Sequence, residues 1–354
     1  MMRHKRNLWG ILYGVCLALF TAFISLDTFV LARVYEPAAS ATAESGVSAE
    51  SGAAAESDSA ADAGGAAESG SAAESDSAAD TGSAADAGGA AESGGTAGAD
   101  TAASAAGAEI LSQDTYSSDG TSITLTAYRV GDTTVYAAAV KADDPSVLKT
   151  ALAEGSYGKN IKEKTSAMAE ENDAVLAVNG DFYGARETGY VIRNGVLYRD
   201  TAGKNNEDLV IYKDGSFGII KESEVSAEEL LQNGAVQVFS FGPALVESGE
   251  IAVTEDEEVG KAMASNPRTA VGITRDGTWL FVVSDGRTDE SAGLSLRVLA
   301  SFLKDLGAET AYNLDGGGSS TMVFRGEIVN KPTTDGKRIR ERSVSDIVYI
   351  ASES

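Results

Sequence analysis

The stretch AYNLDGGGSST, residues Ala311–Thr321, decides how the C-terminal part of this chain is interpreted. Residues Glu309–Leu314 predict a short strand, and three consecutive glycines then interrupt it. Glycines in a row are tolerated mainly where the backbone adopts positive φ or approaches another group closely. In an open α/β sheet such a loop lies at the carboxyl end of its strand, where ligands commonly bind. Asp315 would then offer a carboxylate while the following N–H groups face an anion; a plain tight turn is the alternative.

The first 34 residues differ in composition from the rest of the chain. The basic start MMRHKR is followed by the apolar stretch Leu8–Leu26 and, after Asp27, by apolar Thr28–Val34. A membrane span needs roughly 20 apolar residues, and a basic start stays in the cytoplasm. Because Leu31-Ala32-Arg33 lacks a small-x-small cleavage pattern, residues 1–34 predict an uncleaved transmembrane signal-anchor rather than a removed signal peptide. The expected location is the cell membrane, crossed once, with the C-terminal domain extracellular.

Residues 35–109 form a second region, rich in Ala, Ser, Gly, Glu and Asp and without Lys or Arg. The nonapeptide AAESDSAAD occurs at Ala54–Asp62 and again at Ala72–Asp80. Low hydrophobicity with charge of one sign cannot offset the entropy of ordering, which predicts a disordered, self-repelling linker. Its expected role is to hold residues 110–354 away from the membrane.

Residues 110–354 are long enough for one large domain. The net charge of −25 argues against a nucleic-acid partner. The only cysteine, Cys16, and the only histidine, His4, precede this domain. The domain therefore has no Ser-His-Asp triad, no Cys-His pair and no histidine-ligated zinc. Among common hydrolases, glycosidases are the large group that works with carboxylates alone.

Hydrophobic patterning predicts strands joined by tight turns, with a few helices. Positive-φ dipeptides that favour hairpins occur at Gly131-Asp132, Asn194-Gly195, Asp214-Gly215 and Asp276-Gly277. Further strands are expected at Asp173–Val178 and Ala235–Phe241, and a small hairpin around Arg325-Gly326. Helices are predicted from Asp144-Pro145 through Ala153, over Ile161–Ala169 and over Ser295–Leu306.

Two arginines flank one of these hairpins. Arg268 precedes its first strand and Arg287 follows its second, so the two side chains should lie near each other. Two guanidinium groups at a shared strand end can bind an anion bidentately, although surface salt bridges are the alternative. The basic loop Lys337–Arg342, in an acidic domain, fits either a negatively charged ligand or a salt-bridged face.

Several separated motifs together resemble the phosphodiester glycosidase family. They are NGDFY at Asn179–Tyr183, NPRTAVG at Asn266–Gly272, DGR at Asp285–Arg287, NLDGGGSS at Asn313–Ser320, IVN at Ile328–Asn330 and ERSV at Glu341–Val344. The resemblance covers about Asp173 to Tyr349, and Ser343 stands where the family often has proline. It implies an α+β fold with a mixed β-sheet core and flanking helices. It also implies hydrolysis of a sugar C1–O bond whose leaving group is a phosphodiester oxygen, in envelope or extracellular polysaccharide, with an N-acetylglucosamine-type sugar.

Under this resemblance, the motif residues receive expected roles. Cleavage at C1 develops an oxocarbenium-like centre and needs carboxylates, for which Asp315 and Asp181 are the first candidates and Asp285 the third. The substrate-binding candidates are Arg268, Arg287 and Arg342 for the phosphate, Gly316, Gly317 and Gly318 through their amides, and Asn179, Asn313, Ser319 and Asn330 for sugar hydroxyls or for orienting the acids.

Other functions stay open at this point. The main alternative is a noncatalytic module that binds cell-wall or exopolysaccharide glycans, and an adhesin or structural tether is a third. No cofactor and no metal is expected. A divalent cation such as calcium, held by scattered carboxylates, is a lesser alternative. The expected partners are a carbohydrate phosphodiester and, through the N-terminal helix, the membrane.

Overall fold

The computed structural model describes residues 13, 15–24, 31–37, 39–40, 107–118, 120–253 and 265–352. Most of the predicted linker lies outside these residues, as do parts of the predicted membrane span. Residues 15–24 are helical. Within the described part of the chain, no helix is long and apolar enough to cross a membrane.

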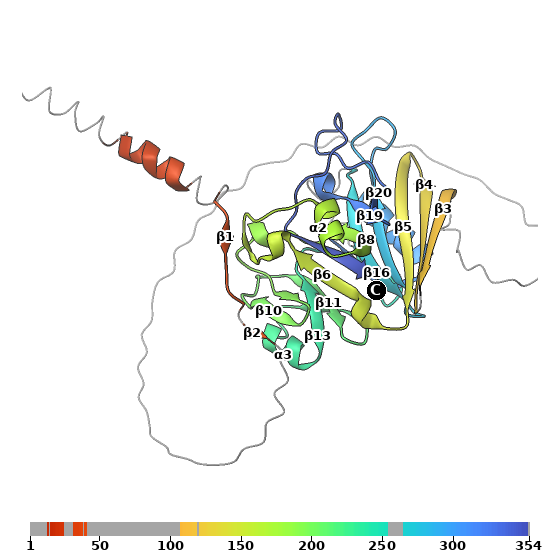
Figure 1. Cartoon of the computed structure of the whole chain (residues 1–354), viewed down its shortest axis with the longest axis horizontal. Helices are drawn as coiled ribbons and strands as arrows, with labels where there is room; N and C mark the ends of the chain where they lie inside the picture. The colour runs from red at the N-terminus through yellow and green to blue at the C-terminus, as the bar shows by residue number, and fades with distance from the viewer. Residues whose placement is uncertain are drawn as a thin grey trace, which may run out of the picture. The chain divides into compact units, whose positions relative to one another are not determined.

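The largest sheet is antiparallel and has eight strands in the order β15-β14-β18-β16-β17-β5-β4-β3. Figure 1 shows β5, β4 and β3 side by side in it. Its strands are β3 (Glu109–Ser118), β4 (Thr121–Val130), β5 (Thr133–Ala142), β14 (Ala244–Glu247), β15 (Glu250–Ile251), β16 (Arg268–Thr274), β17 (Trp279–Ser284) and β18 (Ala308–Asn313). The hairpins predicted at Gly131-Asp132 and Asp276-Gly277 are confirmed, since β4 pairs with β5 and β16 with β17.

Two smaller sheets complete the domain. A five-stranded sheet has the order β20-β19-β8-β21-β6, with β6 (Leu148–Leu152), β8 (Ala174–Asn179), β19 (Met322–Phe324), β20 (Glu327–Ile328) and β21 (Asp346–Ala351). A six-stranded sheet has the order β12-β11-β13-β9-β10-β2, with β2 (Ala39–Ser40), β9 (Val191–Arg193), β10 (Val196–Arg199), β11 (Glu207–Tyr212), β12 (Phe217–Lys221) and β13 (Ala235–Phe239). The remaining pair joins β1 (Arg33–Val34) to β7 (Gly158–Lys159).

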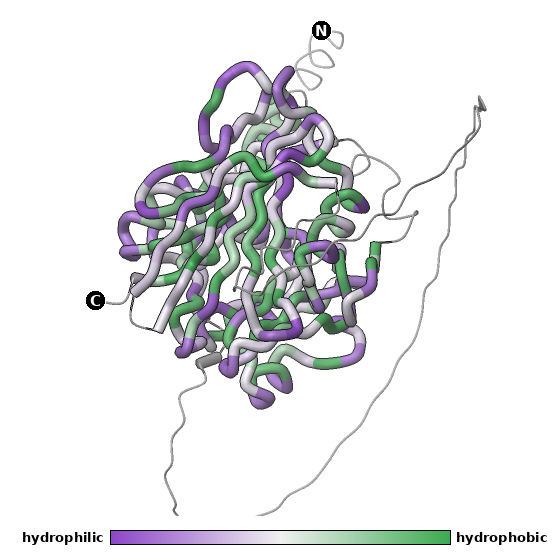
Figure 2. Tube along the Cα trace, turned by 90° about the vertical axis from the view of Figure 1, so that its right-hand side faces the viewer, coloured by the Kyte–Doolittle hydropathy of each residue, from purple (hydrophilic) through white to green (hydrophobic). Residues whose placement is uncertain are grey.

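The main core is shared by all three large sheets. It includes Phe281 from the eight-stranded sheet, Leu176 from the five-stranded sheet and Phe239 from the six-stranded sheet. Because successive side chains of a strand point to opposite faces, Val271 enters this core while its neighbour Ala270 faces a second cluster. Hydrophobic residues accordingly run along the inner strands, and hydrophilic residues gather in the turns (Figure 2).

Three short α-helices cover outer faces of the sheets. These are α2 (Thr165–Glu171), α3 (Ala227–Gln232) and α4 (Leu296–Asp305), and 3-10 turns lie at Pro145–Val147, Ala153–Gly155, Tyr183–Ala185 and Gly317–Ser319. The predicted helix over Ser295–Leu306 is confirmed: Ser295 caps it by accepting from the Val298 N–H, and Leu299 and Leu303 pack on the eight-stranded sheet.

Two predictions about the fold were wrong. The helix expected from Asp144-Pro145 to Ala153 is a single 3-10 turn followed by β6, because Leu148–Leu152 pairs with β21 and this tertiary pairing outweighs local propensity. The sheet core was expected to be mixed. Among the described residues, the paired strands of the three large sheets run antiparallel. The domain is therefore mostly antiparallel β-sheet with few helices.

Candidate active site

The motifs meet where β8, β13 and β18 end and where β16 and β21 begin. The Asp315 N–H donates to the Gly180 carbonyl (3.2 Å), and the Gly180 N–H donates to the Asp346 carbonyl (2.9 Å). The Leu314 N–H donates to the Thr269 carbonyl (2.9 Å) at the start of β16. Because neighbouring antiparallel strands run in opposite directions, one edge gathers both ends and beginnings of strands. The carboxyl-end rule of open α/β sheets therefore does not apply to this antiparallel sheet, and a ligand site at the loop after β18 stays a prediction.

The three glycines of the loop after β18 are required by close approach and by one turn. A Cβ on Gly316 would lie 2.9 Å from the Pro267 carbonyl oxygen, and a Cβ on Gly318 would lie 2.3 Å from Thr334 Oγ1. Gly317 has a φ of +63°, and a Cβ there would lie 2.8 Å from Arg287 Nη2. Side chains cannot fit between this loop and its neighbours, which is the packing that consecutive glycines indicated.

The three arginines predicted to bind a phosphate all lie close to this loop. The Arg268 side chain lies beside Gly316, with Cδ 3.9 Å from a Cβ built there, and its Nε donates to the Leu294 carbonyl (2.9 Å). Arg287 is held by Nη2 donating to Asn266 Oδ1 (3.1 Å) and Nη1 donating to the Thr334 carbonyl (2.9 Å). The third, Arg342, lies before β21, and its backbone N–H donates to the Gly318 carbonyl (3.3 Å).

Asp315 lies beneath Arg342 and is the one carboxylate of the three candidates with a partly accessible side chain, 13% exposed. Its Oδ2 accepts from Ser319 Oγ (2.6 Å) and from Arg342 Nη2 (3.1 Å). Arg342 Nε also donates to Ser319 Oγ (2.9 Å), which closes a ring of contacts. Burial raises the pKa of Asp315 above its usual value, against the opposing effects of Ser319 and Arg342.

Asp181 is fully buried in a network of charges. Its Oδ1 accepts from the Tyr183 N–H (3.0 Å) and its Oδ2 from the Ser240 N–H (3.2 Å). Arg193 Nη2 lies 3.0 Å from Asp181 Oδ2, and Arg193 Nε donates to Asp346 Oδ2 (2.8 Å). One guanidinium thus bridges two carboxylates.

Arg193 and Asp346 were missed by the sequence reasoning. Arg193 stands beside the Asn194-Gly195 turn, which was interpreted as structural, and Asp346 follows the last motif. Burial raises the pKa of Asp346. The available signal was a charged residue that ends the otherwise apolar strand β9, because an unpaired charge is not tolerated in a core.

The asparagine candidates use their side chains within the protein. Asn179 Nδ2 donates to the Asp315 carbonyl (2.6 Å), and its Oδ1 accepts from Thr269 Oγ1 (2.8 Å). Asn330 Nδ2 donates to the Ser320 carbonyl (3.0 Å). Asn313 Nδ2 donates to the Gly242 carbonyl (2.8 Å), while its buried Oδ1 has no hydrogen-bond partner. Asn179 and Asn330 therefore fix the loop, and a ligand contact by either stays a prediction.

Asp285 contacts a different loop from the other two acids. Its Oδ1 accepts from the Lys331 N–H (2.7 Å), next to Asn330. Burial is the largest influence on its pKa, which is raised. Asp181 and Asp315 are both among the groups that act electrostatically on Asp346, so these three carboxyls form one neighbourhood.

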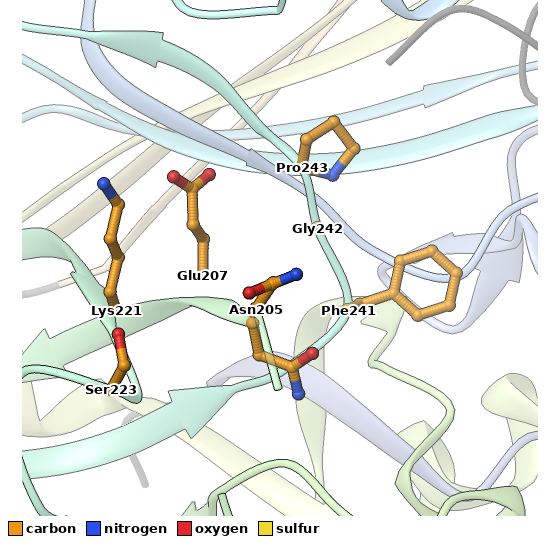
Figure 3. A pocket seen from close by; sticks show the side chains of 8 residues that line it. Asn205, Glu207, Lys221, Ser223, Phe241, Gly242 and Pro243 are labelled. Atoms are coloured by element: carbon orange, nitrogen blue, oxygen red, sulfur yellow. The ribbon is translucent and has the colours of Figure 1, made fainter. Parts of the chain in front are cut away.

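A pocket of about 520 Å³ adjoins this neighbourhood through the chain that follows β13. Its wall includes Phe241, Gly242 and Pro243, directly after Ser240, which binds Asp181 (Figure 3). Within the described ranges, no group of three or more His, Cys, Asp or Glu side chains is arranged to hold a metal ion.

Comparison with known proteins identifies relatives of this domain. An SPbeta prophage-derived uncharacterised protein of Bacillus subtilis, YomE, is 32% identical over 202 residues, which are 55% of this chain and 30% of that protein. The N-acetylglucosamine-1-phosphodiester alpha-N-acetylglucosaminidase of mouse is 33% identical over 195 residues, 49% of this chain and 37% of the enzyme. The human enzyme is 30% identical over 202 residues, 51% of this chain and 38% of the enzyme. The chain spans about a third of the length of these relatives.

Structural comparison agrees on the fold. The solved catalytic domain of the zebrafish N-acetylglucosamine-1-phosphodiester alpha-N-acetylglucosaminidase matches with a TM-score of 0.54 and 23% identity, over 70% of this chain and 88% of that domain. The sequence profile of phosphodiester glycosidases matches residues 172–351, just over half of the chain and the range that holds the glycine loop, the arginines and the buried acids. The chain therefore belongs to the phosphodiester glycosidase family.

Proposed function

We propose that the domain hydrolyses a sugar-1-phosphodiester at the C1–O bond, with an N-acetylglucosamine-type sugar from envelope or extracellular polysaccharide. The observation that carries this proposal is the ring of Arg268, Arg287 and Arg342 around a glycine loop whose first neighbour is Asp315. Guanidinium groups suit a phosphodiester anion. A carboxylate next to them suits the positive charge that develops at C1. The family relationship supports a hydrolase of this general kind.

Asp315 is our candidate for the reacting carboxylate. In the free protein it is paired with Arg342, and a bound phosphodiester competes for that guanidinium. Once Arg342 turns to the phosphate, the Asp315 carboxylate faces the sugar. Water then forms a bond to C1, the C1–O bond breaks, and its electron pair leaves with the phosphomonoester. The proton lost by water passes to the Asp315 carboxylate.

Asp181 acts indirectly in this proposal. Its Oδ2 lies beside Arg193 and accepts from the Ser240 N–H, its Oδ1 accepts from the Tyr183 N–H, and the residue is 1% exposed. It positions the Gly180 loop that accepts from the Asp315 N–H. Asp285 likewise positions the loop at Lys331.

Replacing Asp315 tests the assignment. The substrate is the nitrophenyl phosphate diester of N-acetylglucosamine, and the readout is released reducing sugar. Asp315→Asn should lower kcat by about 10²–10⁴-fold, because the charge that assists C1 is lost, while the melting temperature stays near that of the unaltered protein. Asp143→Asn, at an exposed aspartate, is the matched control.

The broken bond is identified in ¹⁸O-water. Label in the released sugar is expected for C1–O cleavage, whereas label in the phosphate would show phosphodiesterase chemistry. Full activity of Asp315→Asn would remove Asp315 from the reaction. Binding without turnover by the unaltered chain would favour a noncatalytic glycan-binding module.

We further propose that the chain is held at the cell membrane by its N-terminal segment, with the domain outside. The support is the sequence alone: a basic start and the apolar stretch Leu8–Leu26. Protease added to intact cells should digest the domain and leave the basic start protected. If the protease digests the domain only after the cells are lysed, the domain lies inside the cell.

A further inference from the structure

The pocket shown in Figure 3 has no part in the reaction proposed above. Its volume is about 520 Å³, within the range of about 300–1,000 Å³ typical of small-molecule sites. Its side chains come from the start of β11, the end of β12 and the segment after β13. The lining residues are Asn205, Asn206, Glu207, Lys221, Ser223, Phe241, Gly242 and Pro243.

The chemistry of this lining suits an uncharged, polyhydroxylated ligand. Glu207 and Lys221 are cross-strand neighbours of opposite charge, so the pocket offers donors and acceptors without favouring an anion. Phe241 is half-buried and adds an aromatic surface to a largely polar site. The amide group of Asn205 can pair with neighbouring hydroxyls, as donor and acceptor together.

The walls of the pocket are held in place from behind. Asn206 Nδ2 donates to Ser240 Oγ (3.0 Å), and Ser240 Oγ donates to Glu222 Oε1 (2.9 Å). Tyr312 OH donates to the Glu207 carbonyl (2.7 Å) and accepts from the Phe241 N–H (2.9 Å). A site whose walls are already ordered loses less entropy when it binds a ligand.

The pocket also has a defined direction relative to the candidate active site. The Gly242 carbonyl in its wall accepts from Asn313 Nδ2 (2.8 Å), and the Pro243 carbonyl accepts from the Asn313 backbone N–H (3.2 Å). The arginines contact the other end of the same segment, at Gly316–Ser319. The pocket wall and the arginines therefore contact opposite ends of the segment Asn313–Ser319.

We infer that this pocket is a subsite for further sugar residues that extend the substrate from its non-phosphorylated end. The reaction at the bond to be broken is taken from the proposed function. The class of ligand is inferred from the residues that line the pocket. It makes the preferred substrate an oligosaccharide or polysaccharide phosphodiester rather than a single N-acetylglucosamine unit.

The experiment compares two nitrophenyl phosphate diesters, one of N-acetylglucosamine and one of its β-1,4-linked trimer. The unaltered chain should show kcat/KM about tenfold or more higher for the trimer, which corresponds to about 1.4 kcal/mol of added binding. Phe241→Ala and Lys221→Ala should remove this preference and leave kcat/KM for the monomer diester unchanged. Lys213→Ala is the matched control, because Lys213 lies at the opposite end of the β11–β12 hairpin.

Equal kcat/KM for the two diesters in the unaltered chain would overturn the subsite and leave the proposed function standing. If neither diester is hydrolysed, the proposed function fails, and the subsite is decided by titrating the free trimer against each protein. Binding to the unaltered chain and to Lys213→Ala, but not to Phe241→Ala, supports the subsite. Absent binding, or binding that Phe241→Ala does not weaken, overturns it.

Discussion

Asp181 and Asp315 occupy similar places in the sequence, each two residues after an asparagine that ends a strand. Their surroundings separate them. Arg193 and two backbone N–H groups saturate Asp181 inside the core, whereas Asp315 faces Ser319 and the half-exposed Arg342. Separating a carboxylate from a buried cation is costly. We therefore assign a structural role to Asp181 and the reacting role to Asp315.

Another buried carboxyl, Asp208, follows the pocket residue Glu207 in β11. Burial, and then the neighbouring Glu222 carboxyl, raises the pKa of Asp208 to about 9. Glu222 itself accepts from the Tyr190 N–H (2.9 Å) and Ser240 Oγ (2.9 Å). Asp208 therefore keeps its proton in the folded protein at neutral pH.

Asp208→Asn should change how stability depends on pH. Above about pH 4 the unfolded chain releases the Asp208 proton and the folded chain does not, so this group lowers stability as pH rises to about 9. The slope contributed is at most about 1.4 kcal/mol per pH unit. Urea unfolding at pH 5 and pH 8 should show a smaller decline in the variant than in the unaltered protein. Parallel declines would show that Asp208 titrates normally.

At the scale of elements, β18 and the loop after it combine two requirements. The strand pairs with β16 and β14, which places Asn313 and Leu314 in the interior. The loop then turns at Gly317 and passes against Thr334 and Arg287 without room for side chains. Loop position, rather than any one hydrogen bond, sets where Asp315 meets the arginines.

Gly318→Ala should therefore impair the site more than the fold. The added Cβ would lie 2.3 Å from Thr334 Oγ1, so the loop or its neighbour must shift. Overpacking of this kind costs about 1–3 kcal/mol of stability, and we expect kcat/KM to fall by about tenfold or more because displaced catalytic groups lose alignment.

The control is Gly218→Ala on β12, where the nearest atom would be 3.3 Å away on the flexible Tyr212 side chain. Adding Thr334→Ala to Gly318→Ala removes the closest atom and should restore part of the activity. If kcat/KM is unchanged in Gly318→Ala, the exact position of this loop does not control the reaction.

At the scale of the whole molecule, residues on both sides of the predicted start of the linker, Leu31 and Tyr35 among them, contact the folded domain. The Tyr35 N–H donates to the Tyr157 carbonyl (2.9 Å), and Asn160 Nδ2 donates to the Leu31 carbonyl (3.1 Å). The Tyr35 and Tyr157 rings lie 6.0 Å apart. The segment that follows the N-terminal helix is thus added to the domain as an edge strand.

Gly158→Ala should release this segment. A Cβ at Gly158 would lie 1.7 Å from the Arg33 carbonyl oxygen, so β1 cannot pair with β7 in the variant. Hydrogen exchange on the full chain should show lost protection at the Tyr35 amide, with unchanged protection in β16. Gly218→Ala again serves as control. Retained protection at Tyr35 would show that the pairing does not depend on this contact.

The sequence by itself determined the local features of this protein. Turn dipeptides predicted the hairpins, a capped amphipathic pattern predicted α4, and the glycine loop with Asp315 and its arginines was found from composition and motif order. These features depend on residues close together in the chain, or on a φ that few residues adopt, so they can be read without the fold.

Only the tertiary structure decided the rest. It made Leu148–Leu152 a strand, arranged the strands antiparallel and buried Asp181 with Arg193 and Asp346. It also formed the pocket between the open end of the β11–β12 hairpin and the segment after β13. Burial and cross-chain pairing depend on residues far apart in sequence. These interactions set which carboxylate is saturated and which one remains able to react.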